Sequence, residues 1–173
     1  MKTETFEKTI TIEEYLKEYV NVEEFLGYCK ACKNYEKIWA CPSYDFDPED
    51  YWKKYQYIKV VGKKIYTENM DSEEWKSVYL EEKHRLSEEL YQMENEKPGS
   101  ISLCAGSCDL CLEAGCTRAT GKPCRYPDKM RYSIESLGGN VGLTVSKLLS
   151  IEIKWMEENS LPEYFVLVGG LLY

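Results

Sequence analysis

Apolar and polar residues alternate along several short stretches of this chain, and an alternation with a period of two predicts β-strands. The clearest stretch is 57–66, YIKVVGKKIY, which is rich in β-branched and aromatic residues. Similar composition predicts four further strands, at 5–10, 101–103, 151–155 and 164–172. We therefore expect a sheet of about five strands.

Helical spacing of apolar residues, together with capping signals, predicts the helices that connect these strands. Thr11 followed by Glu14, and Asn21 followed by Glu24, are the residue pairs of two capping boxes. The longest predicted helix covers 71–94, where apolar residues recur near helical spacing. Shorter helices are predicted from Pro48, from Pro127 to a C-cap at Gly138, and from Val141 to Leu149.

Strands and helices in this order predict an α+β fold. We expect a single domain over 1–173, with a roughly five-stranded sheet, helices packed beside it and two cysteine-rich loops that meet in space. A chain of 173 residues is long enough to bury a core. Its 43% hydrophobic and 30% charged content is ordinary for a soluble globular protein.

Charge and hydropathy limit the partners that we expect. The net charge of −8 argues against a surface that binds nucleic acid. The longest apolar run, 164–173, is too short to cross a bilayer, and the first ten residues lack the apolar segment of a signal peptide. We therefore expect a cytoplasmic protein with reduced thiols and with no nucleic-acid or membrane partner. The sequence does not indicate an oligomeric state.

All eight cysteines fall in two short segments, which we call the first motif (27–42) and the second motif (104–127). The first motif reads Cys-x2-Cys-x8-Cys-Pro, and the second reads Cys-x3-Cys-x2-Cys-x4-Cys-x7-Cys. A Cys-x-x-Cys turn directs two thiolates at one centre, in zinc sites and in iron–sulfur sites alike. The candidate metal ligands are Cys29, Cys32, Cys41, Cys104, Cys108, Cys111, Cys116 and Cys124.

Three features favour iron–sulfur clusters over zinc. The candidate ligands are all sulfur, since the single histidine, His84, lies in the predicted long helix. Four thiols lie within the 17 residues from Cys108 to Cys124, and a proline follows Cys41 as in bacterial ferredoxin motifs. Two zinc ions with four thiolates each fit the same count, so a zinc site stays open as the alternative. Disulfides are disfavoured by the cytoplasmic setting.

The stretch from Arg118 to Arg131 is basic, with five basic residues against one acid, although the protein as a whole is acidic. Such a group, which we call the basic collar, could offset the charge of a cluster, bind a redox partner protein or bind a small anionic substrate. Arg118, Lys122 and Arg125 are the candidate cofactor-contacting residues. The collar comprises Arg118, Lys122, Arg125, Lys129 and Arg131.

The segments GYCKACKNYEKIWACP (27–42) and GSCDLCLEAGCTRATGKPCRYPDKMRYSIESLGGNVGLT (106–144) resemble the predicted metal-binding proteins of domain of unknown function 2284. The resemblance covers essentially the whole chain and implies metal binding, with iron–sulfur expected, but no established reaction. It also implies three cysteines in the first motif and four in the second, with Cys104 as an addition. The spacing between Cys111 and Cys116 is longer than the usual two residues.

We expect two [4Fe-4S]-type clusters that pass single electrons. Cys104, at the end of the strand 101–103, is the one thiol left to complete a four-ligand site at the first motif. If the first motif keeps only three ligands, an open iron would make the protein an enzyme with a Lewis-acid site. A zinc-stabilised interaction module is the third hypothesis.

Overall fold

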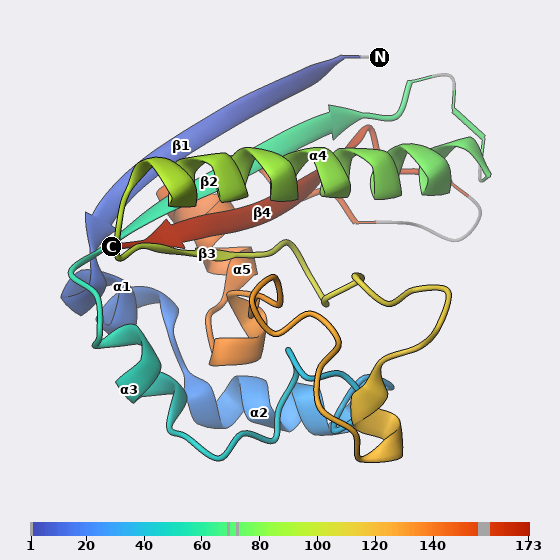
Figure 1. The fold of residues 1–173 in the computed structure, drawn as a ribbon. Helices are drawn as coiled ribbons and strands as arrows, with labels where there is room; N and C mark the ends of the chain where they lie inside the picture. The colour runs from blue at the N-terminus through green and yellow to red at the C-terminus, as the bar shows by residue number, and fades with distance from the viewer. Residues whose placement is uncertain (1, 69, 72, 156–159) are drawn as a thin grey trace.

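The chain forms one antiparallel sheet with helices on both faces (Figure 1). The structure is a computed structural model that describes residues 2–68, 70–71, 73–155 and 160–173. Across the sheet the strand order is β1-β2-β4-β3. The strands are β1 (Thr3–Thr11), β2 (Tyr57–Tyr66), β3 (Ile101–Leu103) and β4 (Tyr164–Leu172).

Side chains of the central strand β2 alternate between the two faces of the sheet, as the sequence pattern predicts. Ile58 and Val60 belong to one buried cluster, while Val61 and Ile65 belong to another on the opposite face. β2 pairs along its whole length with both β1 and β4. The predictions of 57–66 and 164–172 are therefore confirmed to the residue.

The fifth predicted strand, 151–155, is wrong, and the sheet has four strands within the described ranges. This segment has no regular secondary structure. Ile151 is buried and Ile153 is partly buried against the cluster that contains Val60. The two isoleucines of the segment therefore lie on the face of the sheet, so their spacing reflects packing rather than pairing at an edge.

The helix capping signals near the N-terminus are confirmed. Thr11 accepts a hydrogen bond from the amide of Glu14, and Asn21 and Glu24 form a reciprocal pair of bonds. Asp71 accepts from the amides of Glu73 and Glu74 and so begins the long helix. The helices are α1 (Ile12–Tyr19), α2 (Val22–Ala31), α3 (Pro48–Trp52), α4 (Glu74–Glu96) and α5 (Val141–Leu143), which continues as a π-helical turn, Thr144–Leu148. No helix of the described residues is both long enough and apolar enough to cross a membrane.

The helix predicted from Pro127 is wrong, apart from its end. Only a short 3-10 turn, Glu135–Leu137, forms, and it ends at Gly138 in the left-handed conformation that was predicted. The backbone before this turn is bonded to the end of β3 instead, because the amide of Cys104 donates to the carbonyl of Tyr132 (2.9 Å). These contacts replace the hydrogen bonds that a helix would need.

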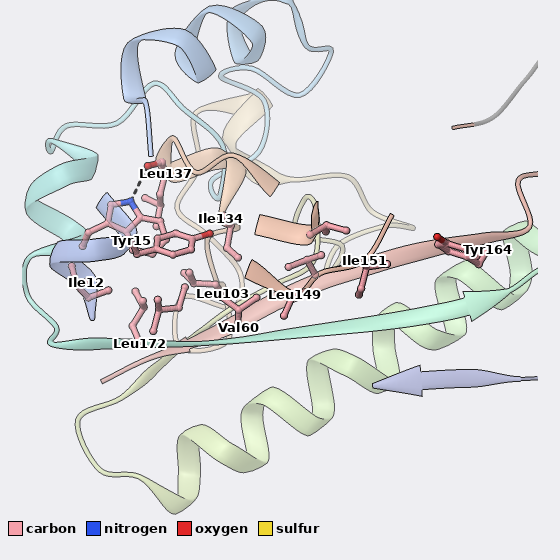
Figure 2. Packing of buried hydrophobic residues seen from close by; sticks show 14 residues of the cluster. Ile12, Tyr15, Val60, Leu103, Ile134, Leu137, Leu149, Ile151, Tyr164 and Leu172 are labelled. Atoms are coloured by element: carbon pink, nitrogen blue, oxygen red, sulfur yellow. Dashed lines mark hydrogen bonds between the residues drawn. The ribbon is translucent and has the colours of Figure 1, made fainter. Parts of the chain in front are cut away.

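The two faces of the sheet carry different layers. α4 covers one face, where Leu86 and Leu90 are buried, and Gly169 allows the close approach because a Cβ there would lie 2.6 Å from Leu90 Cδ1. The other face carries the larger cluster, in which Tyr15, Ile134 and Leu137 gather beside the sheet (Figure 2). α2 and the first motif lie beyond that layer, on the side away from α4, whereas the second motif starts at the end of β3 beside α4 (Figure 1).

Gly138 holds α2 close to the 3-10 turn. Its φ is +85°, and a Cβ at this position would lie 2.7 Å from the Cα of Val22, the first residue of α2. The amide of Asn21 donates to the carbonyl of Gly138 at 2.9 Å. Since α2 carries the first two cysteines, this contact positions the first motif relative to the core.

We predict that Gly138→Ala destabilises the protein by about 2–5 kcal/mol, measured by urea denaturation. Left-handed strain contributes about 1–2 kcal/mol, and the clash with the Val22 backbone contributes a further 1–3 kcal/mol or so. Gly99→Ala is the matched control, because Gly99 has the same φ of +85° but no atom within 4 Å of an added Cβ. Equal losses of unfolding free energy in the two variants would show that the contact with α2 does not contribute to stability.

Candidate metal centre

The first motif begins at the C-terminal end of α2. Cys29 lies within the last turn of the helix, and Cys32 is its C-cap residue, whose amide donates to the Cys29 carbonyl at 3.0 Å. The amide of Asn34 points at the sulfur of Cys32 at 3.5 Å. The loop closes where the Glu36 amide donates to the carbonyl of Pro42 at 2.8 Å. An N–H directed at a sulfur stabilises a thiolate, so this turn suits a metal ligand.

Four thiols of the second motif line one cavity. Its volume is about 320 Å³, and its walls include residues of both motifs. From the first motif, Ile38, Trp39 and Ala40 form part of its lining. The structure thus brings together the four cysteines that the sequence groups into one centre, which are Cys108, Cys111, Cys116 and Cys124.

All eight cysteines lie in the described part of the chain, and none is in a disulfide. Within the same part, no three His, Cys, Asp or Glu side chains converge closely enough to hold a single metal ion. The thiols of the second motif instead surround the cavity at its walls. Soft, unpaired thiols around one space fit an iron–sulfur cluster or zinc by their chemistry.

Neighbouring thiols oppose one another's ionisation. Burial raises the pKa of Cys41 to about 11, and the nearby thiols of Cys32 and Cys29 act in the same direction. Burial also raises the pKa of Cys108, to which Asp109, Cys124 and Cys111 add. A metal cation removes this repulsion, so binding would release protons from the thiols.

Cys104 lies beside the second motif. Its buried thiol donates to the carbonyls of Gly106 and Arg131, both at 3.3 Å, and burial raises its pKa. Cys104 and Cys108 both line a groove of about 610 Å³ along α4. The assignment of Cys104 to the first centre stays a prediction, since the one thiol that acts on its pKa is Cys108 and not a thiol of the first motif.

The guanidinium group of Arg118 joins the two motifs. It donates to the carbonyls of Ile38 (3.0 Å), Cys41 and Ser43 (2.6 Å), all in or next to the first motif. It also lies over the ring of Trp39, 5.3 Å from the ring centre. The Trp39 indole in turn donates to the carbonyl of Lys122 at 3.2 Å. Arg118 therefore acts here as a clamp between loops.

Two further arginines of the basic collar also donate hydrogen bonds to oxygen atoms of the protein. Arg125 donates to the carbonyl of Gly115 at 2.5 Å. Arg131 pairs with Glu94 at the end of α4 through two bonds, of 2.5 and 3.0 Å. Burial acts to raise the pKa of Glu94, yet hydrogen bonds from Arg131 and Ser102 hold it below its usual value. A cofactor-binding role for Arg118, Lys122 and Arg125 stays a prediction, while their structural role as clamps is visible for the two arginines.

Sequence reasoning missed Lys83, which is buried on α4. Its ammonium group donates to the carbonyl of Ser107 at 2.6 Å and pairs with Asp109 at 2.9 Å, so it anchors the start of the second motif. The signal was its position: Lys83 lies four residues after Tyr79 and three before Leu86, in line with the apolar stripe of the helix. Its neighbour His84, in contrast, is exposed.

These features define a protein with a cysteine-lined metal-binding site on an α+β framework. The family described as predicted metal-binding protein (DUF2284) matches residues 15–173, so the chain belongs to this family. Comparison with curated proteins and comparison with solved structures each gave no match. The predicted family is therefore confirmed, and with it metal binding as the family's described property.

We predict that Arg118→Lys lowers stability by about 2 kcal/mol although it keeps the charge. A lysine loses the planar fork that reaches several carbonyls at once, and each charge-assisted bond is worth about 1.5–3 kcal/mol. Arg125→Lys is the control, because Arg125 donates to a single carbonyl. Thermal unfolding followed by circular dichroism compares the two. Equal, small effects would show that only the charge of the collar matters.

Proposed function

We propose that this chain is an iron–sulfur protein with two [4Fe-4S]-type clusters that passes single electrons to a partner protein. The cavity lined by four thiols carries the proposal. With a zinc–sulfur distance of about 2.3 Å, four thiolates around one zinc lie only about 3.8 Å apart and leave no such space. A cluster is itself a body of several atoms between its thiolates, so a volume of about 320 Å³ suits it better.

The two motifs divide the ligands between two centres. Cys108, Cys111, Cys116 and Cys124 would hold the second centre, and the three cysteines of the first motif would hold the first. A bound cluster supplies one-electron chemistry. Trp39 and its neighbours shield the second centre from water, and Arg118 keeps the motifs together. Cys41 and Cys108 lie close enough to affect each other electrostatically, so the centres would be neighbours.

An iron–sulfur enzyme is the second candidate, and one observation favours it. The first motif supplies three thiols, while Cys104 shares a groove with Cys108. That groove, of about 610 Å³, is large enough for a small molecule. A zinc-stabilised interaction module is the third candidate, and it would be colourless.

We predict that the protein purified without oxygen is brown and contains about eight iron and eight sulfide ions per chain, as two cubane clusters require. Cys124→Ser should lose about half of the iron, because it opens the second centre only. Elemental analysis and electron paramagnetic resonance measure both. Zinc in place of iron in the wild-type protein would contradict the proposal and favour the zinc module.

We also predict that removing the metal with a chelator and a reductant lowers the melting temperature strongly. The two motifs contain little regular structure beyond the end of α2 and one 3-10 turn, so metal binding provides folding energy that burial does not. Differential scanning calorimetry and near-ultraviolet dichroism follow the change. An apo-protein with unaltered melting and dichroism would show that the metal is not structural.

A further inference from the structure

Glu135 has one carboxylate oxygen for which the fold offers no hydrogen-bond partner. It lies in the 3-10 turn Glu135–Leu137, between the buried residues Ile134 and Ser136. Its Oε2 atom is shielded from solvent and has no hydrogen-bond donor among the described residues. Burying a carboxylate without a partner costs several kcal/mol, so such an oxygen indicates a ligand or a cation.

A cavity beside Glu135 reaches the first motif. Its volume is about 150 Å³, and both Glu135 and Cys29 line it, whereas Cys32 and Cys41 do not. The carboxylate is near enough to Cys29 to act on its thiol: burial raises the pKa of Cys29, and Cys32 and Glu135 raise it further. The unpartnered oxygen and the thiol of Cys29 therefore share one neighbourhood.

The backbone holds this arrangement in place. The amide of Asn21 donates to the carbonyl of Gly138 at 2.9 Å, and the amide of Asn140 donates to the carbonyl of Tyr19 at 2.7 Å. These bonds tie the segment that carries Glu135 to the start of α2, the helix that carries Cys29. The carboxylate is therefore positioned by two elements that are bonded to each other.

The nearest cation does not neutralise this carboxylate. Burial raises the pKa of Glu135, while hydrogen bonds from its own backbone and from Ser133, and the charge of Lys83, act to lower it. The ammonium group of Lys83 is already bonded to Ser107 and paired with Asp109. No ion pair among the described residues includes Glu135. A metal centre at the first motif would provide the missing positive charge.

We propose that Glu135 is the fourth protein ligand of the first centre, where it joins Cys29, Cys32 and Cys41. This inference rests on the proposed function, since it requires a metal at the first motif. A carboxylate is a harder ligand than a thiolate and holds iron less firmly in a sulfur-bridged cluster. The first centre would then differ from the all-thiolate second centre in its reduction potential. The iron bound by Glu135 would also exchange its ligand more readily, so that a small anion could bind there.

Two variants test the proposal in protein purified without oxygen. Glu135→Gln removes the anionic ligand and should lose one to four of the roughly eight iron ions, with a three-iron signal in electron paramagnetic resonance after mild oxidation. Glu135→Cys restores an anionic ligand and should return the iron content to the wild-type value with an altered spectrum. Glu113→Gln is the matched control, because it makes the same change at an exposed position of the second motif and should change nothing.

Each outcome decides the question. Wild-type iron and an unaltered spectrum in Glu135→Gln would overturn the proposal, as would an iron loss that Glu135→Cys does not restore. Cys104→Ser serves as the competing variant: if it loses iron at the first centre while Glu135→Gln does not, Cys104 is the ligand. Iron absent from the wild-type protein would instead refute the proposed function itself.

Discussion

The two cysteine motifs contain few apolar side chains to bury, so their positions depend on polar contacts with the framework around them. The Arg118 guanidinium holds the first motif against the second through backbone carbonyls, and Lys83 of α4 fixes the start of the second motif. Arg131 ties the end of the second motif to Glu94. These bonds lie between partly buried charged donors and oxygen acceptors, which are the stronger class of hydrogen bond. The metal site is therefore built on basic residues of α4 and of the loops themselves.

The same framework creates an unfavourable environment for empty thiols. Burial and mutual repulsion raise the pKa values of Cys29, Cys41 and Cys108, so these thiols stay protonated near neutral pH without a metal. A bound metal would reverse this preference, and its binding energy would then contribute to folding. The sheet and its two apolar clusters supply the remaining stability, because apart from Ala105 they are formed by segments outside the motifs. Framework and site thus depend on different interactions.

Local chemistry explains why so much of the fold was predictable. β2 and β4 carry their own β-branched and apolar pattern, and α1 and α2 carry capping residues that act within four positions. The segments 127–134 and 151–155 were predicted wrongly because their apolar spacing is satisfied by contacts with distant residues. One is bonded to Cys104 at the end of β3, and the other lies across the face of the sheet. Periodicity cannot distinguish these cases, since it records burial and not the partner.

The sequence by itself determined the class of site: eight cysteines in two motifs, in the spacing of the metal-binding family, because ligand type and spacing are properties of the chain alone. Only the tertiary structure decided which other groups surround the cysteines of the two motifs. It placed Cys104 next to Cys108, used Arg118 and Arg125 as clamps for carbonyls, and left the buried oxygen of Glu135 without a partner beside the first motif. These outcomes depend on which segments meet across the fold, and that is set by long-range packing rather than by local pattern.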